Sequence, residues 1–205
     1  MFQAPRKEGF AMNTQKSHFH RNLLITLVVL FVLTLAAFVY AIWAGEQANM
    51  LGWEMLLNIP ILSIPLVLIF GSVYVLLMGW HERSTLGNVS PRLAKIIHWA
   101  PRIAAILIIL FAGLFSLDVF GTVASPLEVL GAFLMHNIPS IVMLVLLIFA
   151  WKRPVVGFVA FLVVAAAFII FFVRDFYAVS NLLLFVLPLL LIASLFYADW
   201  QWLKA

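Results

Sequence analysis

Two apolar runs decide the fold of this chain: IAAILIILFAGLFSLDV at 103–119 and VLGAFLMHNIPSIVMLVLLIFAW at 129–151. Each is close to the roughly 20 apolar residues that an α-helix needs to cross the hydrocarbon core of a bilayer. The first run nevertheless contains Asp118, and the second contains His136. The two runs therefore predict a pair of membrane-spanning helices that carry two ionisable side chains.

The composition of the whole chain points to the same environment. Of its 205 residues, 66% are hydrophobic and 10% are charged, whereas a soluble domain carries roughly 25% charged residues. In lipid each backbone polar group needs a partner within the protein, and a helix supplies that partner locally. The sequence lacks the strict alternation that is typical of a lipid-spanning barrel. We therefore expect an all-α polytopic membrane protein.

Six apolar runs predict six transmembrane helices, paired as three hairpins. The predicted spans are 22–43, 55–79, 102–120, 127–151, 155–173 and 180–198. The first run is too long for the apolar region of a signal peptide, so we expect it to be retained as a helix. The corresponding division is a disordered tail at 1–21, a first hairpin at 22–79, a connection at 80–101, a four-helix unit at 102–198 and a second tail at 199–205.

The distribution of cations predicts the orientation in the membrane. Eleven of the twelve Lys and Arg residues fall in the two tails, the 80–102 connection and the 151–154 turn. Only Arg174 falls on the other side. Because cytoplasmic loops carry the excess of Lys and Arg, both termini are expected to face the cytoplasm. The predicted location is the cytoplasmic (inner) membrane of a prokaryote.

Two short stretches carry signals for the start of a helix. Ser90-Pro91 resembles an N-cap followed by proline at the first helical position. After it, the apolar side chains fall on one side of a helix and the basic ones on another. We therefore expect a short interfacial helix near 90–100, which either anchors in lipid or docks a partner. Ser125-Pro126-Leu127-Glu128 matches the S-x-x-E capping box, so the fourth span should begin near Pro126.

Depth estimates bring the two intramembrane ionisable groups to a similar height. Asp118 lies 16 residues beyond Arg102, and His136 lies 15 residues before Trp151. At about 1.5 Å per residue, these positions are roughly 24 Å and 22 Å from the same boundary. On adjacent antiparallel helices the two side chains would form a favourable pair, because each satisfies the other away from water.

Three more polar side chains complete this candidate intramembrane site. Asn137 and Ser140 lie on the same run as His136, and Asn58 on the second span would join them if the hairpins pack side by side. Ionisable groups in a membrane are candidates for a solute site or a proton relay. The alternative is structural: Asp118 would sit at the outer interface, and His136 would hydrogen-bond a neighbouring helix and fix the packing.

Small residues at four-residue intervals predict close helix packing. They are Ala37, Ala41 and Gly45 on the first span and Ala112 and Ser116 on the third. Such faces let two helices approach closely within a bundle or against a partner subunit.

Several kinds of chemistry have no support in the sequence. The chain has no cysteine, which excludes disulfides, thiolate catalysis and iron–sulfur sites. A haem at His136 would need a second histidine at the same depth, and His81 and His98 lie near the opposite boundary. No nucleotide-binding or nucleophile motif occurs. We therefore expect no cofactor, no metal, no catalytic residues and no nucleic-acid partner.

The last two-thirds of the chain resembles a known kind of protein. The residues that carry the resemblance are Pro101-Arg102-Ile103, LFSLDVF at 114–120, His136-Asn137-Ile138-Pro139 and AWKRPVVG at 150–157. They are similar to a family of small uncharacterised prokaryotic membrane proteins with a four-helix domain of unknown function, over about 102–198. The resemblance implies a membrane-embedded four-helix unit and brings no activity.

Two functions remain in view from the sequence. The first is a non-enzymatic accessory or scaffold subunit that packs against another membrane protein or a second copy of itself. Short loops and the absence of a recognisable catalytic motif favour it. The second is a small permease or a substrate-binding transporter component that uses the Asp118–His136 pair. The first needs a face that a partner covers, and the second needs a wet cavity.

Overall fold

The structure of the chain is a computed structural model, which describes residues 6–44, 52–121, 125–173 and 178–204. Within these ranges, the side chains at 6–17, 42–44, 52–61, 115, 118, 121 and 178 lie outside the description. The described residues are almost all helical and include no strand, which confirms the all-α prediction. Six of their helices are long and apolar enough to cross a membrane, as the six runs predicted. The chain is thus a multi-pass membrane protein.

The chain divides into two compact units, residues 1–49 and 50–205. The first contains one helix, α1 (Arg6–Ala44), whose candidate span is His18–Ala41. The prediction of a disordered tail is wrong from Arg6 onward, because the helix of the first span continues outward through those residues. Lys, Glu, Ala, Met and Gln, which favour helix, occur among residues 6–17.

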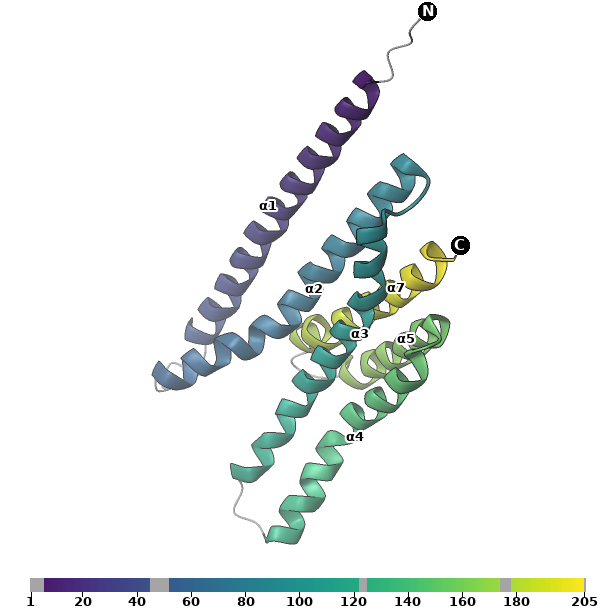
Figure 1. The fold of residues 1–205 in the computed structure, drawn as a ribbon. Coiled ribbons are helices and arrows are strands. Elements are labelled where there is room, and N and C mark those ends of the chain that lie inside the picture. Colours follow the sequence, from purple (N-terminus) through teal and green to yellow (C-terminus); the bar gives the residue numbers. More distant parts are fainter. Residues whose placement is uncertain (1–5, 45–51, 122–124, 174–177, 205) are drawn as a thin grey trace, which may run out of the picture. The chain divides into compact units, whose positions relative to one another are not determined.

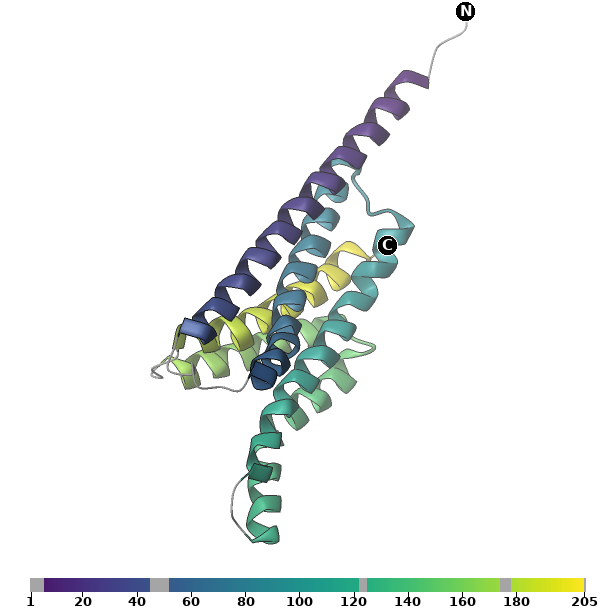
Figure 2. The same ribbon diagram turned by 90° about the vertical axis from the view of Figure 1, so that its left-hand side faces the viewer.

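The second unit is a helical bundle built around α3 (Pro91–Leu114) and α7 (Leu187–Trp202). These two helices contact each other, and both contact α2 (Gly52–Leu86). α3 also contacts α4 (Pro126–Ala150), and α7 also contacts α5 (Pro154–Phe172). α4 and α5 meet at the turn that joins them and diverge away from it (Figure 1, Figure 2).

α3 is longer than the sequence predicted. The helix does begin at Pro91 after Ser90, but it continues through Pro101 into the third span. The prediction of a separate interfacial helix near 90–100 is therefore wrong, as is the start of that span at 102. Leu93, Ile97, Ala104 and Ile108 are all buried and form one stripe across Pro101. Packing of this stripe holds the helix together where proline removes a backbone hydrogen bond.

Local signals set two of the helix boundaries. The capping box at α4 is confirmed: the Ser125 hydroxyl accepts from the backbone N–H of Glu128, whose carboxylate accepts from the backbone N–H of Ser125 at 2.9 Å. At the end of α2, Gly87 adopts φ +72° and its N–H donates to the carbonyl of Arg83. This left-handed glycine ends the helix. The buried Glu82 carboxylate then accepts from the N–H of Ser90 at 2.8 Å, which fixes the turn into α3.

The last span is not a uniform α-helix. It begins with α6 (Ala178–Asn181), continues as a π-helical turn, η3 (Leu182–Val186), and becomes α7 at Leu187. Pro188 follows directly, and it cannot donate a backbone hydrogen bond. In the wider π turn, the N–H of Leu187 donates to the carbonyl of Leu182. This turn accommodates the proline, and the span stays helical on both sides of it.

Two glycines allow the closest helix contacts in the bundle. A Cβ atom at Gly157 on α5 would lie 2.7 Å from the ring of Phe196 on α7. Phe196 and Phe161 are fully buried and stack with ring centroids 5.7 Å apart. A Cβ atom at Gly79 on α2 would lie 2.4 Å from the ring of Trp202. Aromatic rings of α7 thus fill the space that these glycines leave.

Candidate functional site

Asn137 and Ser140 form the part of the predicted polar site that the structure brings together. Both lie on α4 and face Gly113 of α3: a Cβ atom there would lie 3.7 Å from Oδ1 of Asn137 and 4.0 Å from Oγ of Ser140. The Asn137 amide donates to the carbonyl of Phe133 at 2.9 Å. Ser140 is buried, and its hydroxyl has no hydrogen-bond partner among the described residues. The result is a small polar spot between α3 and α4.

His136 lies one helical turn before Ser140 on α4 but is not enclosed with it. Its side chain is exposed, and its Nδ1 lies 2.8 Å from the carbonyl oxygen of Ala132 in the same helix. Its neighbour Met135 is also strongly exposed, at 68%. Among the described residues, His136 makes no hydrogen bond to another helix.

The remaining members of the predicted site cannot be placed as side chains. Asp118 lies in a 3-10 helix, η2 (Phe115–Gly121), that continues from α3. Its side chain and that of Asn58 on α2 lie outside the described residues, so the Asp118–His136 pair stays a prediction. Gly45 of the small-residue faces lies outside the described residues too, while Ala37 and Ala41 are one turn apart on α1.

The small residues on the third span have a packing role. Ala112 is half-buried, and Ser116 is buried. The Ser116 hydroxyl donates to the carbonyl of Gly113 at 2.6 Å, at the point where α3 gives way to η2. A hydroxyl that bonds its own backbone three residues back competes with regular α-helical bonding there. This fits the change to a 3-10 helix where the sequence predicted continuous α-helix.

A second polar cluster, which the sequence did not predict, lies at the other end of α3. Arg102 and Asp199 are both buried and form an ion pair, with Nη1 of Arg102 donating to Oδ2 of Asp199 at 2.8 Å. Arg102 comes from α3 and Asp199 from the last turn of α7. Although the sequence placed these residues at the two ends of the predicted four-helix unit, both side chains lie inside the bundle.

Neighbouring groups complete the hydrogen bonding of this pair. Arg102 also donates to the carbonyl of His98 and, through Nη2, to the carbonyl of Trp151 at 2.9 Å. The second oxygen of Asp199 lies 3.1 Å from Nδ1 of His98. The ring of Phe196 lies 5.9 Å from the guanidinium carbon. One buried cation thus ties together α3, α7 and the end of α4.

The chemistry of the Arg102 cluster is structural rather than reactive. A buried charge is tolerated when its partner and further hydrogen bonds replace the lost water, as they do here. The signal in the sequence was weak: two opposite charges, 97 residues apart, each among apolar neighbours at the same end of the bundle. Among the described residues no group of three His, Asp or Glu side chains could hold a metal ion.

Comparison with known proteins finds one family. Residues 90–205 match the model of a domain of unknown function (DUF7670). The match covers more than half of the chain and begins at the residue before α3, so α1 and α2 lie outside it. It bears out the predicted resemblance to an uncharacterised family, with an earlier start than 102. No curated protein and no solved structure matches the chain.

Proposed function

This chain belongs to the DUF7670 family of unknown function, and we propose that it is a non-enzymatic accessory or scaffold subunit that packs against another membrane protein. The observation that carries the proposal is the exposed imidazole of His136 on an apolar face of α4. We call this face the α4 docking face. It consists of Met135, His136, Pro139, Val142 and Phe149, which are all exposed and share one side of the helix by their spacing.

The depth of His136 makes its exposure informative. It lies ten residues after Pro126 and fourteen before Ala150, which is roughly 15 Å and 21 Å along the helix. Such a position falls within the hydrocarbon core of about 30 Å. Ionisable side chains at that depth almost always face a bundle interior, a cavity or a partner. A second transmembrane helix over the α4 docking face would supply the partner that Nε2 lacks among the described residues.

The arrangement of the helices leaves room for that partner. α4 and α5 diverge from their shared turn (Figure 2), so the first half of α4 contacts mainly the end of α3 and η2. From Pro126 to Pro139 no side chain of α4 is buried. Hydrogen bonds between transmembrane helices contribute about 0.6 kcal/mol on average, and up to about 1.7. His136 would thus add specificity to an interface whose main contact is apolar.

The test is co-purification of the full chain in mild detergent, with native mass spectrometry to count subunits. We expect a complex of constant stoichiometry, either with one other membrane protein or with a second copy of the chain. His136→Leu should lower the yield of the complex about threefold, because it removes one hydrogen bond between transmembrane helices. The monomer should remain folded, since the imidazole is exposed and its hydrogen bond among the described residues is to its own helix.

Met135→Leu is the matched control, because it changes an exposed apolar neighbour on the same helix without removing a polar group. It should leave the complex unchanged. A chain that purifies alone under conditions that preserve known membrane complexes contradicts the proposal. Equal loss of the complex in the two variants would also contradict it, because His136 would then carry no specificity.

The orientation proposed for the subunit has both termini in the cytoplasm of a prokaryotic cell. It is supported by the eleven cations that fall in the tails and in the 80–102 and 151–154 segments. The natural absence of cysteine makes the test direct. Asn88 precedes α3 and Leu127 lies at the start of α4, so the two exposed positions are at opposite ends of the bundle. Asn88→Cys and Leu127→Cys should therefore react differently with a membrane-impermeant maleimide. Labelling of position 127 alone in intact cells agrees with the proposal, and labelling of position 88 alone reverses it.

One observation favours the second candidate, a small permease. The buried hydroxyl of Ser140 has no partner among the described residues and shares its spot with Asn137. A water molecule or a polar solute there would satisfy it. This candidate predicts that Asp118→Asn and His136→Ala abolish a solute or proton flux in liposomes. Unchanged flux in both variants removes it.

A further inference from the structure

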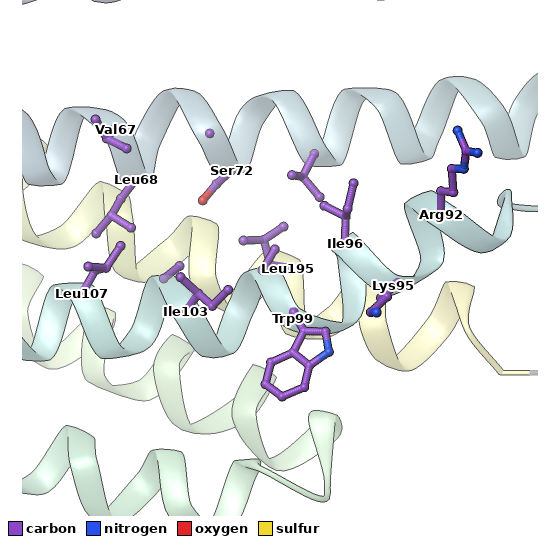
Figure 3. Close-up of a pocket in the computed structure, with 14 residues that line it drawn as sticks. Val67, Leu68, Ser72, Arg92, Lys95, Ile96, Trp99, Ile103, Leu107 and Leu195 are labelled. Atoms are coloured by element: carbon purple, nitrogen blue, oxygen red, sulfur yellow. The ribbon is translucent and has the colours of Figure 1, made fainter.

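A groove between α2 and α3 is a feature of the second unit that the proposed function does not use. It encloses about 490 Å³, within the range of roughly 300–1,000 Å³ that is usual for ligand sites. Its walls are apolar, with Val67, Leu68 and Val75 from α2 and Ile96, Ile103 and Leu107 from α3. Figure 3 shows these walls, with Leu107, Val67 and Leu68 together at one end.

The other end of the groove carries positive charge. Arg92 and Lys95 line it there, and both side chains are exposed (Figure 3). Neither has an ion-pair partner among the described residues. This contrasts with Arg102, seven residues after Lys95, whose charge is fully matched. The groove therefore joins a long apolar slot to two unmatched cations.

The dimensions of the groove fit one leaflet of a bilayer. From Lys95 to Leu107 the helix rises roughly 18 Å, against about 15 Å for half of the hydrocarbon core. Trp99 lines the groove between the cations and the apolar end and is 44% exposed. Tryptophan favours this depth, where its ring meets the headgroup region. The cations thus lie where a headgroup lies and the slot where an acyl chain lies.

We propose that the α2–α3 groove binds one phospholipid with an anionic headgroup, its phosphate on Arg92 and Lys95 and an acyl chain along the slot. The charges select the lipid, because an apolar wall offers an acyl chain little that the surrounding lipid does not. Each cation near the membrane surface strengthens the attraction of an anionic lipid about fivefold. The two together give about a 25-fold preference over a zwitterionic lipid with the same chains. This proposal does not depend on the proposed partner of α4.

Gly71 makes the apolar slot testable by itself. It lines the groove, and a Cβ atom there would have no heavy atom within 4 Å. Gly71→Leu therefore has room for its Cβ atom, and its side chain should extend into the slot. Gly131 on α4 is an equally open glycine outside the groove, so Gly131→Leu is the matched control. Both substitutions favour helix. A loss of lipid binding in Gly71→Leu alone would therefore not be explained by unfolding.

The experiment is native mass spectrometry of the full chain, titrated with phosphatidylglycerol or with phosphatidylcholine of the same chains. We expect one tightly bound phosphatidylglycerol. Arg92→Gln/Lys95→Gln should weaken it about 25-fold and leave phosphatidylcholine unchanged. Lys152→Gln/Arg153→Gln removes the same charge from the 151–154 turn and should weaken it less than threefold. Gly71→Leu should abolish the tight site, and Gly131→Leu should preserve it.

Three results would overturn the proposal. Equal binding of the two lipids would remove the role of the cations. An equal effect of Arg92→Gln/Lys95→Gln and Lys152→Gln/Arg153→Gln would mean that the lipid responds to the total positive charge at this end of the bundle and not to the groove. Full binding in Gly71→Leu would place the lipid elsewhere; if that variant does not fold, the comparison of the two charge variants still decides. A chain that binds no lipid in its native form, because its own first helix or another copy fills the groove, overturns the proposal as well.

Discussion

The two ends of α4 differ in how the bundle uses polar groups. At its C-terminal end, the carbonyl of Trp151 accepts from the buried Arg102, which also pairs with Asp199. In its first half, His136 is exposed, and among the described residues it bonds only within its own helix. The first arrangement is complete within this chain, and the second is not. A polar group that is satisfied internally indicates a structural joint, whereas one left outward in lipid indicates a surface for another molecule.

The largest expected effect comes from disrupting the Arg102–Asp199 ion pair at the C-terminal end of α4. Asp199→Ala leaves the guanidinium of Arg102 buried without its carboxylate, which typically costs about 3–5 kcal/mol of folding free energy. Arg102→Met/Asp199→Leu removes both charges and should recover most of that loss. Unfolding by sodium dodecyl sulfate, followed by circular dichroism, measures both. If Asp199→Ala is as stable as the native chain, the cluster is not a structural joint.

A smaller effect comes from the close contact beside the cluster. Gly157→Ala places a methyl group 2.7 Å from the buried ring of Phe196, on the helix that also carries Asp199. Overpacking of this kind costs about 1–3 kcal/mol. Gly131→Ala, in the open half of α4, meets nothing within 4 Å and should stabilise the chain by about 0.5–1 kcal/mol through helix propensity. The same unfolding assay should give opposite signs, and equal signs would erase the distinction between the two regions.

The smallest expected effect concerns the N-terminal end of α4. The start of α4 is held by its own cap rather than by the bundle, so Ser125→Ala should cost about 1 kcal/mol. The loss should appear as faster amide hydrogen exchange in the first turns of α4, with little change near Arg102. Ser125→Asp keeps a capping side chain and serves as the control. Uniformly faster exchange would mean that the two ends are coupled.

The sequence predicted the features that depend on neighbouring residues. The six apolar runs gave the candidate spans, and Ser125 with Glu128 gave the start of α4, because span length and capping are local. Local patterns also misled in two places. The segment near 90–100 was predicted as a separate interfacial helix, but the buried stripe of Leu93, Ile97 and Ala104 makes it part of α3. Residues from Arg6 were assigned to a tail, although they extend the first helix.

By itself, the sequence determined that this chain crosses a membrane as helices, because lipid demands internal hydrogen bonds and an apolar surface of fixed length. The tertiary structure decided which polar groups meet. Arg102 and Asp199 are separated by 97 positions, and their contact depends on how α3 and α7 are rotated about their axes. The same rotation turned Asn137 and Ser140 toward α3, whereas His136, one turn earlier, lies where no described helix covers it. Apolar runs constrain such rotations weakly, because nearly every face of these helices is apolar.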